Sequence, residues 1–344
     1  MPTLNYIGSK SKLLPWVCEK IDAHTGFGTD GWQGHTFADL FSGTASVASA
    51  YRAKGARVIA NDAELYAATI AHAVVRSQYT QKLNRIMITI DEAIDANQYM
   101  QTAGFITRNY SPFETSERMY FTVDNAQRID FARQYLENIA STLTEDEYKY
   151  ILATIICSAD QVANTASVYG AYLKQFKATA NQPFYMIPVH INSNSCDGVA
   201  HNTAAGNLDI HADAVYIDPP YNERQYSKNY FVLNVIAMKP SEQNALPPLK
   251  GKTGIPEDCY LSPFCQKKNV ELAFRALVAK CHARWVFISY NSESLLSRAK
   301  MVELLGHFGT VTVEEKVYKK FKSSAAVENA EVTEYLFCLE QPPQ

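Results

Sequence analysis

Apolar residues in the first part of the chain alternate between helical spacing and short uninterrupted runs. Leu13, Leu14, Val17 and Ile21 recur every three or four residues, which predicts a helix over residues 9–23. The same alternation predicts, in order, a strand at 35–41, a helix at 45–54, a strand at 56–60 and a helix at 64–76. Strands that alternate with helices in this way form a parallel sheet joined by crossover helices.

The middle of the chain has a different pattern. From about residue 79 to 175 helical spacing dominates, and Thr144 with Glu147 predicts a capping box that begins a helix through Ile156. A loop-rich stretch at 181–207 follows. The first pattern then resumes, with a strand at 214–217, a helix from about Ser227, a helix at 270–282, a strand at 285–289, a helix at 294–308 and an antiparallel strand pair at 311–318 and 332–339. The sequence therefore predicts an α/β fold with a mostly helical insertion.

Composition sets limits but does not indicate a function. The 344 residues carry a net charge of −3 and are 47% apolar, as in an ordinary globular protein. Because strong non-specific nucleic-acid binders are usually basic overall, a polyanion would have to bind on a local basic surface. The chain has neither an apolar run near the ~20 residues that cross a bilayer nor the start of a signal peptide, so we expect a cytoplasmic protein with no membrane partner.

The seven cysteines are scattered along the chain. They form no Cys-x-x-Cys pair, and no histidine cluster lies near them in the sequence. Zinc sites are typically built from such closely spaced ligands. We therefore expect free thiols and no metal site.

The clearest chemical signal is Asp218-Pro219-Pro220-Tyr221, directly after the strand at 214–217. Open parallel sheets bind their ligands at the carboxyl ends of strands. The Asp218 carboxylate and the Pro219 carbonyl could accept both hydrogens of an exocyclic amino group, such as that of adenine, and so direct its lone pair. Pro220 has no competing N–H and a fixed φ, while Tyr221 could stack on the base. The alternative is a proline-stiffened turn with a capping aspartate.

Two earlier turns predict a pocket for a nucleoside that carries an amino-acid tail. Gly43, after the strand at 35–41, permits a tight turn and close approach of a ligand to the backbone, and Asp39 could pair with an ammonium group. Asp62 follows the next strand, about 20 residues downstream, where a ribose is usually bound. A plain strand-to-helix connection at Gly43 and a helix-capping role for Asp62 remain open. The spacing does not match Gly-x-Gly-x-x-Gly, which disfavours a dinucleotide.

Three motifs occur in the order found in one enzyme family: Asn5-Tyr-Ile-Gly-Ser-Lys10, Asp39-Leu-Phe-Ser-Gly-Thr44 and Asp218-Pro-Pro-Tyr-Asn222. In these motifs the chain resembles DNA adenine methylases of the Dam-like D12 class. The segments 224–230 and 289–292 are similar to the restriction–modification methylases of the FokI type. The similarity covers about residues 3–76 and 202–340, with a weaker echo at 163–174.

The resemblance implies a Rossmann-like, S-adenosylmethionine-dependent methyltransferase with a mixed seven-stranded sheet and no metal in its site. The implied catalytic residues are Asp218, Pro219, Pro220 and Tyr221. The implied cofactor-binding residues are Tyr6, Gly8 and Lys10 beside the cofactor and the extruded base, Asp39 and Phe41 at the methionine part, Gly43 at the turn, Asp62 at the ribose, and Asp218. Two positions depart from the family: Ala45 stands where a glycine is frequent, and the acid expected near the cofactor adenine appears as Ala204 or is shifted to Asn207 or Asp209.

The same resemblance implies a discontinuous catalytic domain, residues 1–78 and 202–344, and a helical target-recognition insertion, residues 79–201. The DNA-binding candidates are Lys10, Lys174, Asn222, Arg224, Tyr226, Lys228, Lys319 and Lys320, and further candidates in the insertion are Arg108, Arg118, Arg128 and Lys177. For the lysine run at 316–322, a solvated surface is an equal alternative.

We therefore expect an enzyme that transfers a methyl group from S-adenosylmethionine to N6 of adenine at a specific sequence in double-stranded DNA. It would extrude the base from the duplex and serve restriction–modification or epigenetic marking, with a cognate restriction endonuclease as a possible partner. RNA adenine N6 or DNA cytosine N4 remains an alternative substrate, because the turn accepts any amino group of similar geometry. A catalytically inactive DNA-binding scaffold is the other alternative.

Overall fold

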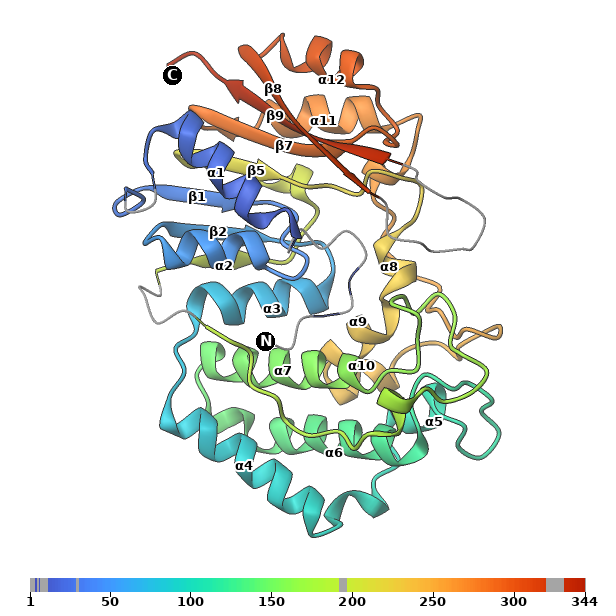
Figure 1. Cartoon of the computed structure of the whole chain (residues 1–344). Helices are drawn as coiled ribbons and strands as arrows, with labels where there is room; N and C mark the ends of the chain where they lie inside the picture. Colours follow the sequence, from blue (N-terminus) through green and yellow to red (C-terminus); the bar gives the residue numbers. More distant parts are fainter. Residues whose placement is uncertain are drawn as a thin grey trace.

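A seven-stranded sheet organises the upper half of the molecule (Figure 1). The computed structural model describes residues 4, 6, 12–28, 31–191, 197–319 and 331–343. The strand order is β3-β2-β1-β5-β7-β9-β8, and β9 runs antiparallel to both its neighbours. The strands are β1 (Thr36–Asp39), β2 (Arg57–Asn61), β3 (Val199–His201), β5 (Ala214–Ile217), β7 (Trp285–Asn291), β8 (Thr310–Lys319) and β9 (Glu331–Glu340). The predicted α/β fold with a mixed seven-stranded sheet is confirmed.

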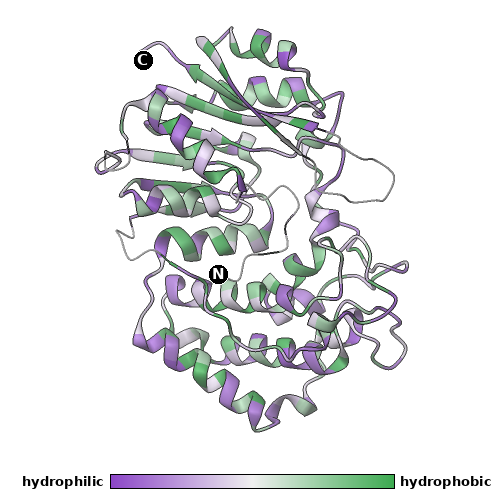
Figure 2. Ribbon diagram, viewed as in Figure 1, coloured by the Kyte–Doolittle hydropathy of each residue, from purple (hydrophilic) through white to green (hydrophobic). Residues whose placement is uncertain are grey.

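Helices cover both faces of this sheet. One face packs against α1 (Leu14–Thr25), α2 (Ser46–Ala53) and α3 (Leu65–Arg76), and the other against α11 (Val270–Val278) and α12 (Arg298–Leu305). Tyr216 and Phe287 point to the first face, whereas Val215 and Ile288 point to the second. Because successive strand residues point to opposite faces, strands covered on both sides are apolar at consecutive positions. Figure 2 shows this as green along the central strands.

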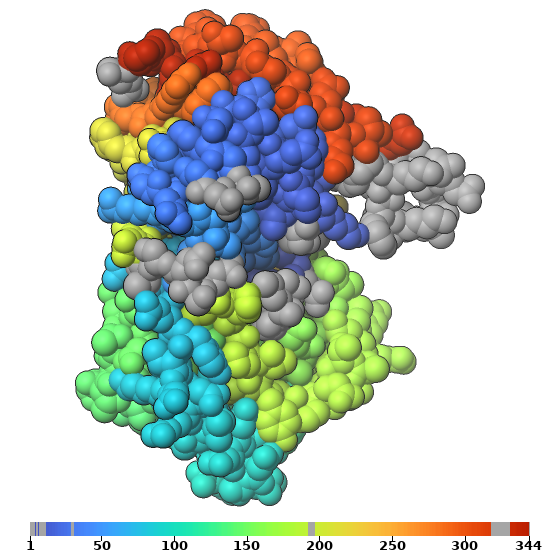
Figure 3. Space-filling model, turned by 60° about the vertical axis from the view of Figure 1, so that its left-hand side comes forward, coloured from blue at the N-terminus to red at the C-terminus, as the bar shows by residue number. Residues whose placement is uncertain are grey.

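The lower half of the molecule is helical (cyan and green in Figures 1 and 3). It contains α4 (Gln81–Asp95), α5 (Phe105–Tyr110), α6 (Val123–Ile139) and α7 (Glu145–Gln161). The short helices α8 (Tyr226–Asn229), α9 (Phe231–Ala237) and α10 (Pro240–Asn244) return the chain from the sheet to this part. This half also contains two short 3-10 helices, Gln98–Gln101 and Ala140–Thr142.

Helix α3 joins the two halves. It packs on β2 and β3 on one side and on α7 and α9 on the other, which explains why it is apolar on nearly all sides. At its end His72 Nε2 lies 2.7 Å from Asp146 Oδ1 of α7, and Arg76 Nε lies 3.3 Å from the same oxygen. The helical part is therefore docked on the sheet through one shared helix.

Most predicted elements are confirmed within a few residues, but two local predictions were incomplete. Strand β3 falls in the stretch predicted to be loop-rich, because its three residues become a strand only by pairing with β2. The helix predicted at 270–282 ends at Val278, and its last two positions form β6 (Cys281–His282), which pairs with β4 (Ile210–His211). Strand β3 lies inside the predicted insertion 79–201 but pairs with β2 and belongs to the sheet. The division of the chain into a catalytic domain and an insertion stays a proposal. No helix among the described residues is long and apolar enough to cross a membrane.

The predicted capping box at the start of α7 is confirmed. The Thr144 hydroxyl accepts from the Glu147 N–H at 3.2 Å, and the Glu147 carboxylate accepts from the Thr144 N–H at 2.9 Å. We expect Thr144→Ala to lower the free energy of unfolding by about 1 kcal/mol, because an orphan N–H of the first helical turn loses its acceptor. Urea unfolding followed by circular dichroism measures this. Ser141→Ala, an exposed neighbour for which the described residues record no side-chain hydrogen bond, is the control, and an equal loss in both variants would contradict the prediction.

Candidate active site

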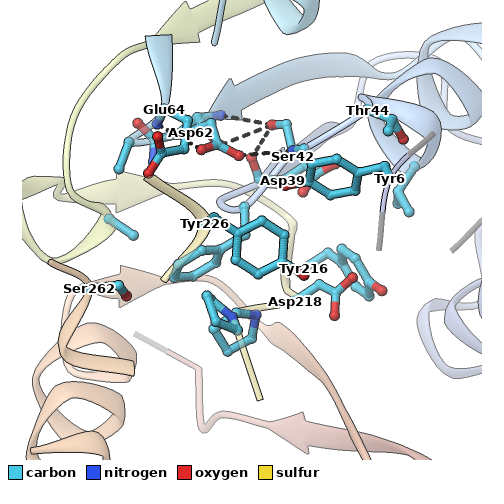
Figure 4. Close-up of a pocket in the computed structure, with 18 of the residues that line it drawn as sticks. Tyr6, Asp39, Ser42, Thr44, Asp62, Glu64, Tyr216, Asp218, Tyr226 and Ser262 are labelled. Atoms are coloured by element: carbon cyan, nitrogen blue, oxygen red, sulfur yellow. Dashed lines mark hydrogen bonds between the residues drawn. The ribbon is translucent and has the colours of Figure 1, made fainter. Parts of the chain in front are cut away.

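The cavity lies where the strand order reverses, at the carboxyl ends of β1 and β5 (Figure 4). Sheets of this topology bind ligands in the crevice at that point. The cavity holds about 890 Å³ of empty space, part of it open to solvent. Its lining comes from both outer parts of the chain: Tyr6, Asp39, Phe41, Ser42, Gly43, Thr44, Ser46, Val47, Asn61, Asp62, Ala63, Glu64, Ala205, Tyr216, Asp218, Pro219, Pro220, Tyr221, Gln225, Tyr226, Tyr260 and Ser262.

Four carboxyl groups line this cavity: Asp39, Asp62, Glu64 and Asp218. Burial, and secondly repulsion from Asp218, raise the pKa of Asp39 to about 8. Burial raises the pKa of Asp62 to about 6 and that of Glu64 to about 7. Oδ2 of Asp39 accepts from the Ala48 N–H at 3.2 Å, whereas the buried Oδ1 has no hydrogen-bond partner among the described residues. Buried acids with unmet acceptors favour a ligand that brings positive charge or hydrogen-bond donors.

The turn after β1 is held by Asp62. Its Oδ2 accepts from the Gly43 N–H and its Oδ1 from the Glu64 N–H, both at 2.9 Å. Gly43 has a φ of +49°, and a Cβ built there would lie 3.1 Å from the Tyr6 ring. Asp62 therefore fastens the ligand-facing turn to Glu64, the residue before α3, without capping that helix, and still lines the cavity.

The proline turn closes the other side of the cavity. Asp218, Pro219, Pro220 and Tyr221 follow β5 directly, and all four line the same space as the turn at Gly43. The aromatic wall comes from elsewhere in the chain. The Tyr6 ring stacks on Tyr230 with centroids 4.7 Å apart, and Tyr226 lies 5.3 Å from Tyr6. The two signals that were separate in the sequence thus meet in one cavity.

Other predicted residues have different surroundings. Arg224 and Lys228 are exposed, and the Asn222 side chain accepts from the Arg224 N–H at 3.0 Å. Arg128 contacts Asp124 at 2.8 Å. Lys174 lines a separate groove together with Arg108 and Arg118. Gly8, Lys10, Lys320 and the side chain of Lys319 lie outside the described residues.

The three positions at which the sequence placed the acid near the cofactor adenine, Ala204, Asn207 and Asp209, are not among the described lining residues, whereas Ala205 is. Asp209 Oδ1 instead lies 2.8 Å from His282 Nε2. A second group of polar side chains lies near the starts of β5 and β7. Asp209 precedes β4, His211 belongs to β4 and His282 to β6. One carboxylate oxygen or ring nitrogen from each of the three lies within 4.8 Å of the others. The prediction of a site without metal stays a prediction.

Several lining residues were missed by the sequence analysis, among them Glu64, Tyr260 and Ser262. Glu64 lies two positions after Asp62, and its carboxylate accepts from Asn234 Nδ2 at 2.5 Å. Its place on the same turn as Asp62 was an available signal. Tyr260 and Ser262 come from a proline- and glycine-rich loop whose pattern indicates no fixed position, so only the folded chain brings them to the cavity.

Comparison with known proteins identifies the family. A model of the "D12 class N6 adenine-specific DNA methyltransferase" family matches residues 6–303. The chain belongs to this class. The methyltransferase is 40% identical to type II methyltransferase M.CviAII of Paramecium bursaria Chlorella virus 1, over 98% of each chain. It is 35% identical to type II methyltransferase M.NlaIII of Neisseria lactamica, over 93% of each. It is 34% identical to type II methyltransferase M.FokI of Planomicrobium okeanokoites, over 98% of this chain and 53% of that one.

Family membership decides between the alternatives left open by the sequence. The predicted activity on adenine N6 in DNA is confirmed, and RNA and cytosine N4 lose support. A methyltransferase requires a methyl donor, and the acid-lined cavity is our candidate place for it among the described residues.

The left-handed turn at Gly43 generates a prediction. We expect Gly43→Ala to destabilise the methyltransferase by about 1–2 kcal/mol, because a non-glycine residue at this φ is strained. The added methyl also presses on Tyr6 at the cavity wall, so methyl transfer should fall more than stability alone explains. Thermal unfolding and transfer of a radioactive methyl group measure the two effects. Gly206→Ala is the matched control, because a Cβ there meets nothing within 4 Å and the φ of Gly206 lies outside the left-handed region. Equal behaviour of both variants would refute the prediction.

Proposed function

We propose that this chain is the methylase of a type II restriction–modification system and uses S-adenosylmethionine to methylate an adenine extruded from duplex DNA. The observation that carries the proposal is the single cavity shared by the Asp218-Pro219 turn and the acid-lined pocket beside Gly43. A base held at the Asp218-Pro219 turn and a methyl donor held beside Gly43 would therefore lie next to each other in this cavity. The type II methyltransferases to which the chain is similar support the biological role.

The pocket beside Gly43 would hold the methyl donor. S-adenosylmethionine carries a sulfonium and an ammonium group, and it supplies a methyl group already activated by the positive sulfur. Oδ1 of Asp39, which has no hydrogen-bond partner among the described residues, would accept from the ammonium group. Phe41, whose ring centroid lies 5.1 Å from that of Phe264, would pack on the methionine part. Asp62 would accept from the ribose hydroxyls with its remaining lone pairs, and Glu64 is a second acceptor on the same turn.

The proline turn would hold the adenine. Its amino nitrogen is a weak nucleophile because the lone pair is delocalised into the ring. The Asp218 carboxylate and the Pro219 carbonyl would accept its two hydrogens and make the lone pair available, while Tyr221 stacks on the ring. Alignment at about 3–3.5 Å between nitrogen and methyl then supplies much of the rate enhancement. The extra proton leaves after transfer, so no strong general base is needed.

The base must leave the duplex to reach Asp218, at a cost of a few kcal/mol that contacts with the protein must offset. Our candidates for these contacts stay the predicted DNA-binding residues: Lys10, Lys174, Asn222, Arg224, Tyr226, Lys228, Lys319 and Lys320. A cognate endonuclease that cuts the unmethylated sequence, and a cytoplasmic location, complete the proposal.

The amino-group acceptor is tested by Asp218→Ala. We expect methyl transfer to DNA to fall by at least about 100-fold, the scale for losing one transition-state contact, with donor binding nearly intact. Nucleoside analysis of treated plasmid DNA detects N6-methyladenine, and calorimetry measures donor binding. Glu223→Ala, an exposed acid outside the cavity lining, is the control. Retained transfer in Asp218→Ala would remove this residue from the mechanism.

The donor pocket is tested by Asp39→Asn. The pKa of the Asp39 carboxyl is higher in the folded than in the unfolded protein, so a proton on this group stabilises the fold. That contribution to the free energy of unfolding is fully present below the unfolded pKa and is lost as the pH rises towards about 8. We expect the neutral amide to raise the stability of the unliganded enzyme at pH 8 by about 1 kcal/mol or more and to leave it unchanged near pH 4. Donor binding should weaken at the same time. Unfolding curves at both pH values and calorimetry check this; lower stability at pH 8 would contradict it.

A further inference from the structure

Two histidines and one aspartate gather at the edge of the sheet opposite the active site. Asp209, His211 and His282 come from the short parallel pair β4 and β6, close to the starts of β5 and β7, and we call them the β4–β6 cluster. The cavity lies beyond the other end of β5, whose four residues span about 13 Å. None of the three side chains lines the cavity. The cluster is therefore a feature separate from the site of methyl transfer.

Strand pairing places the three side chains on one face. His211 and His282 are register partners in the parallel pair, and so are Ile210 and Cys281. Ile210 and Cys281 are 3% and 1% exposed and belong to the core. Because successive strand residues point to opposite faces, His211 and His282 point outward, and Asp209, two positions before His211, joins them.

The backbone that carries the cluster is held by hydrogen bonds of its own. The Ile210 N–H donates to the Lys280 carbonyl at 2.9 Å, and the Ala212 N–H donates to the His282 carbonyl at 3.2 Å. The Lys280 ammonium donates to the Gly206 carbonyl at 2.6 Å, which ties the residue before β6 to the turn before β4. The starting points of the three side chains are therefore fixed, while their exposed ends can still rotate.

The donor atoms of the cluster converge. His282 Nε2 lies 2.8 Å from Asp209 Oδ1, and His211 Nε2 lies 3.8 Å from Asp209 Oδ2. The two imidazole rings stack with centroids 4.5 Å apart and 13° between their planes. Two donors of a tetrahedral zinc ion lie roughly 3.3 Å apart, given bonds of about 2.0–2.1 Å. Small rotations of these side chains would therefore bring all three donors to one ion.

The donor set selects the class of ion. Imidazole nitrogens suit Zn²⁺, Ni²⁺ and Cu²⁺, whereas Mg²⁺ and Ca²⁺ prefer oxygen ligands. The side chains of Asp209 and His211 are 67% and 73% exposed, so water can complete the coordination. The thiol of Cys281 is not a ligand, because it is buried and donates to the Leu277 carbonyl at 3.3 Å.

A histidine–aspartate pair at the same edge of the sheet lacks these features. His35 Nδ1 lies 3.5 Å from Asp213 Oδ1, but the His35 ring stacks on Phe27 with centroids 3.7 Å apart. The other carboxylate oxygen of Asp213 accepts from the Thr36 N–H at 2.6 Å. With one imidazole and an engaged carboxylate, this pair offers an ion fewer donors than the β4–β6 cluster.

We propose that the β4–β6 cluster binds one divalent transition-metal ion of the zinc type through the Asp209 carboxylate and Nε2 of His211 and His282. The ion would join the two strands in addition to their backbone hydrogen bonds, and so stabilise the fold without taking part in methyl transfer. Sequence spacing did not indicate this site, because Asp209 and His282 lie 73 residues apart. The inference goes beyond the proposed function and does not depend on it, and the methyl-transfer site is still predicted to hold no metal.

Metal titration of the full-length enzyme tests the donor set. We expect Co²⁺ to give the wild type a visible absorption typical of nitrogen and oxygen ligands, which His211→Ala weakens. Calorimetry should show Zn²⁺ binding at least about 10-fold weaker in His211→Ala, because few protein ligands share the binding free energy. Asp209→Asn should act in the same direction and serves if His211→Ala does not fold.

The matched control is His190→Ala, which removes an exposed histidine outside the cluster. This variant should bind Co²⁺ and Zn²⁺ like the wild type. The inference is overturned if the wild type binds neither ion, if His211→Ala and His190→Ala bind Zn²⁺ equally, or if the absorption that Co²⁺ produces is that of a thiolate complex.

Thermal unfolding tests the stabilising role. Free Zn²⁺ at about 100 times its Kd should raise the Tm of the wild type by a few degrees, and EDTA should reverse the change. His211→Ala should lose most of this shift, and Mg²⁺ should cause none. An equal shift in both proteins, or with Mg²⁺, would reject the role.

Methyl transfer separates this inference from the proposed function. In EDTA, His211→Ala should methylate DNA with the kcat of the wild type, because the cluster lies away from the cavity. A large loss of kcat would contradict a purely stabilising ion. A wild type that binds Zn²⁺ at the cluster but methylates no DNA would refute the proposed function and leave the metal site standing.

Discussion

Burial of several carboxyl groups at one sheet edge is the constraint on which the site depends. The backbones of β1, β2 and β5 bring Asp39, Asp62 and Asp218 to a single cavity. Removing acids from water costs free energy unless they gain donors, protons or a positive partner. Asp39 shows the effect most clearly, since its pKa is raised to about 8 by burial and by Asp218. Burial of these acids is therefore electrostatically unfavourable by itself, and a cationic ligand would offset that cost.

The surrounding polar residues keep these acids in place. Ser42 Oγ donates to the carbonyls of Asp39 at 3.1 Å and Asn61 at 3.0 Å, and Asn61 Nδ2 donates to the Leu40 carbonyl at 3.0 Å. Asp62 uses both carboxylate oxygens to hold the neighbouring backbone. Little reorganisation is then needed when ligands bind, which is what methyl transfer by alignment requires.

The two halves of the molecule are coupled through shared elements rather than through a linker. Helix α3 packs on the sheet and on α7, and Asn234 of α9 bonds both to Glu64 at the cavity and to the Tyr66 N–H at the start of α3. The position of the helical half relative to the strand ends is therefore fixed by packing and hydrogen bonds.

Local pattern by itself determined the helices, the buried strands and the motif residues, because these features depend on residues close together in the chain. It also placed Asp39, Asp62 and Asp218 at strand ends, and the parallel sheet then required them to meet. Only the tertiary structure decided the strand β3, which needs β2 as a partner, and the hydrogen bonds of Glu64 and Arg118. Their hydrogen-bond partners lie 170 and 131 residues away in the chain, a separation that no local pattern encodes.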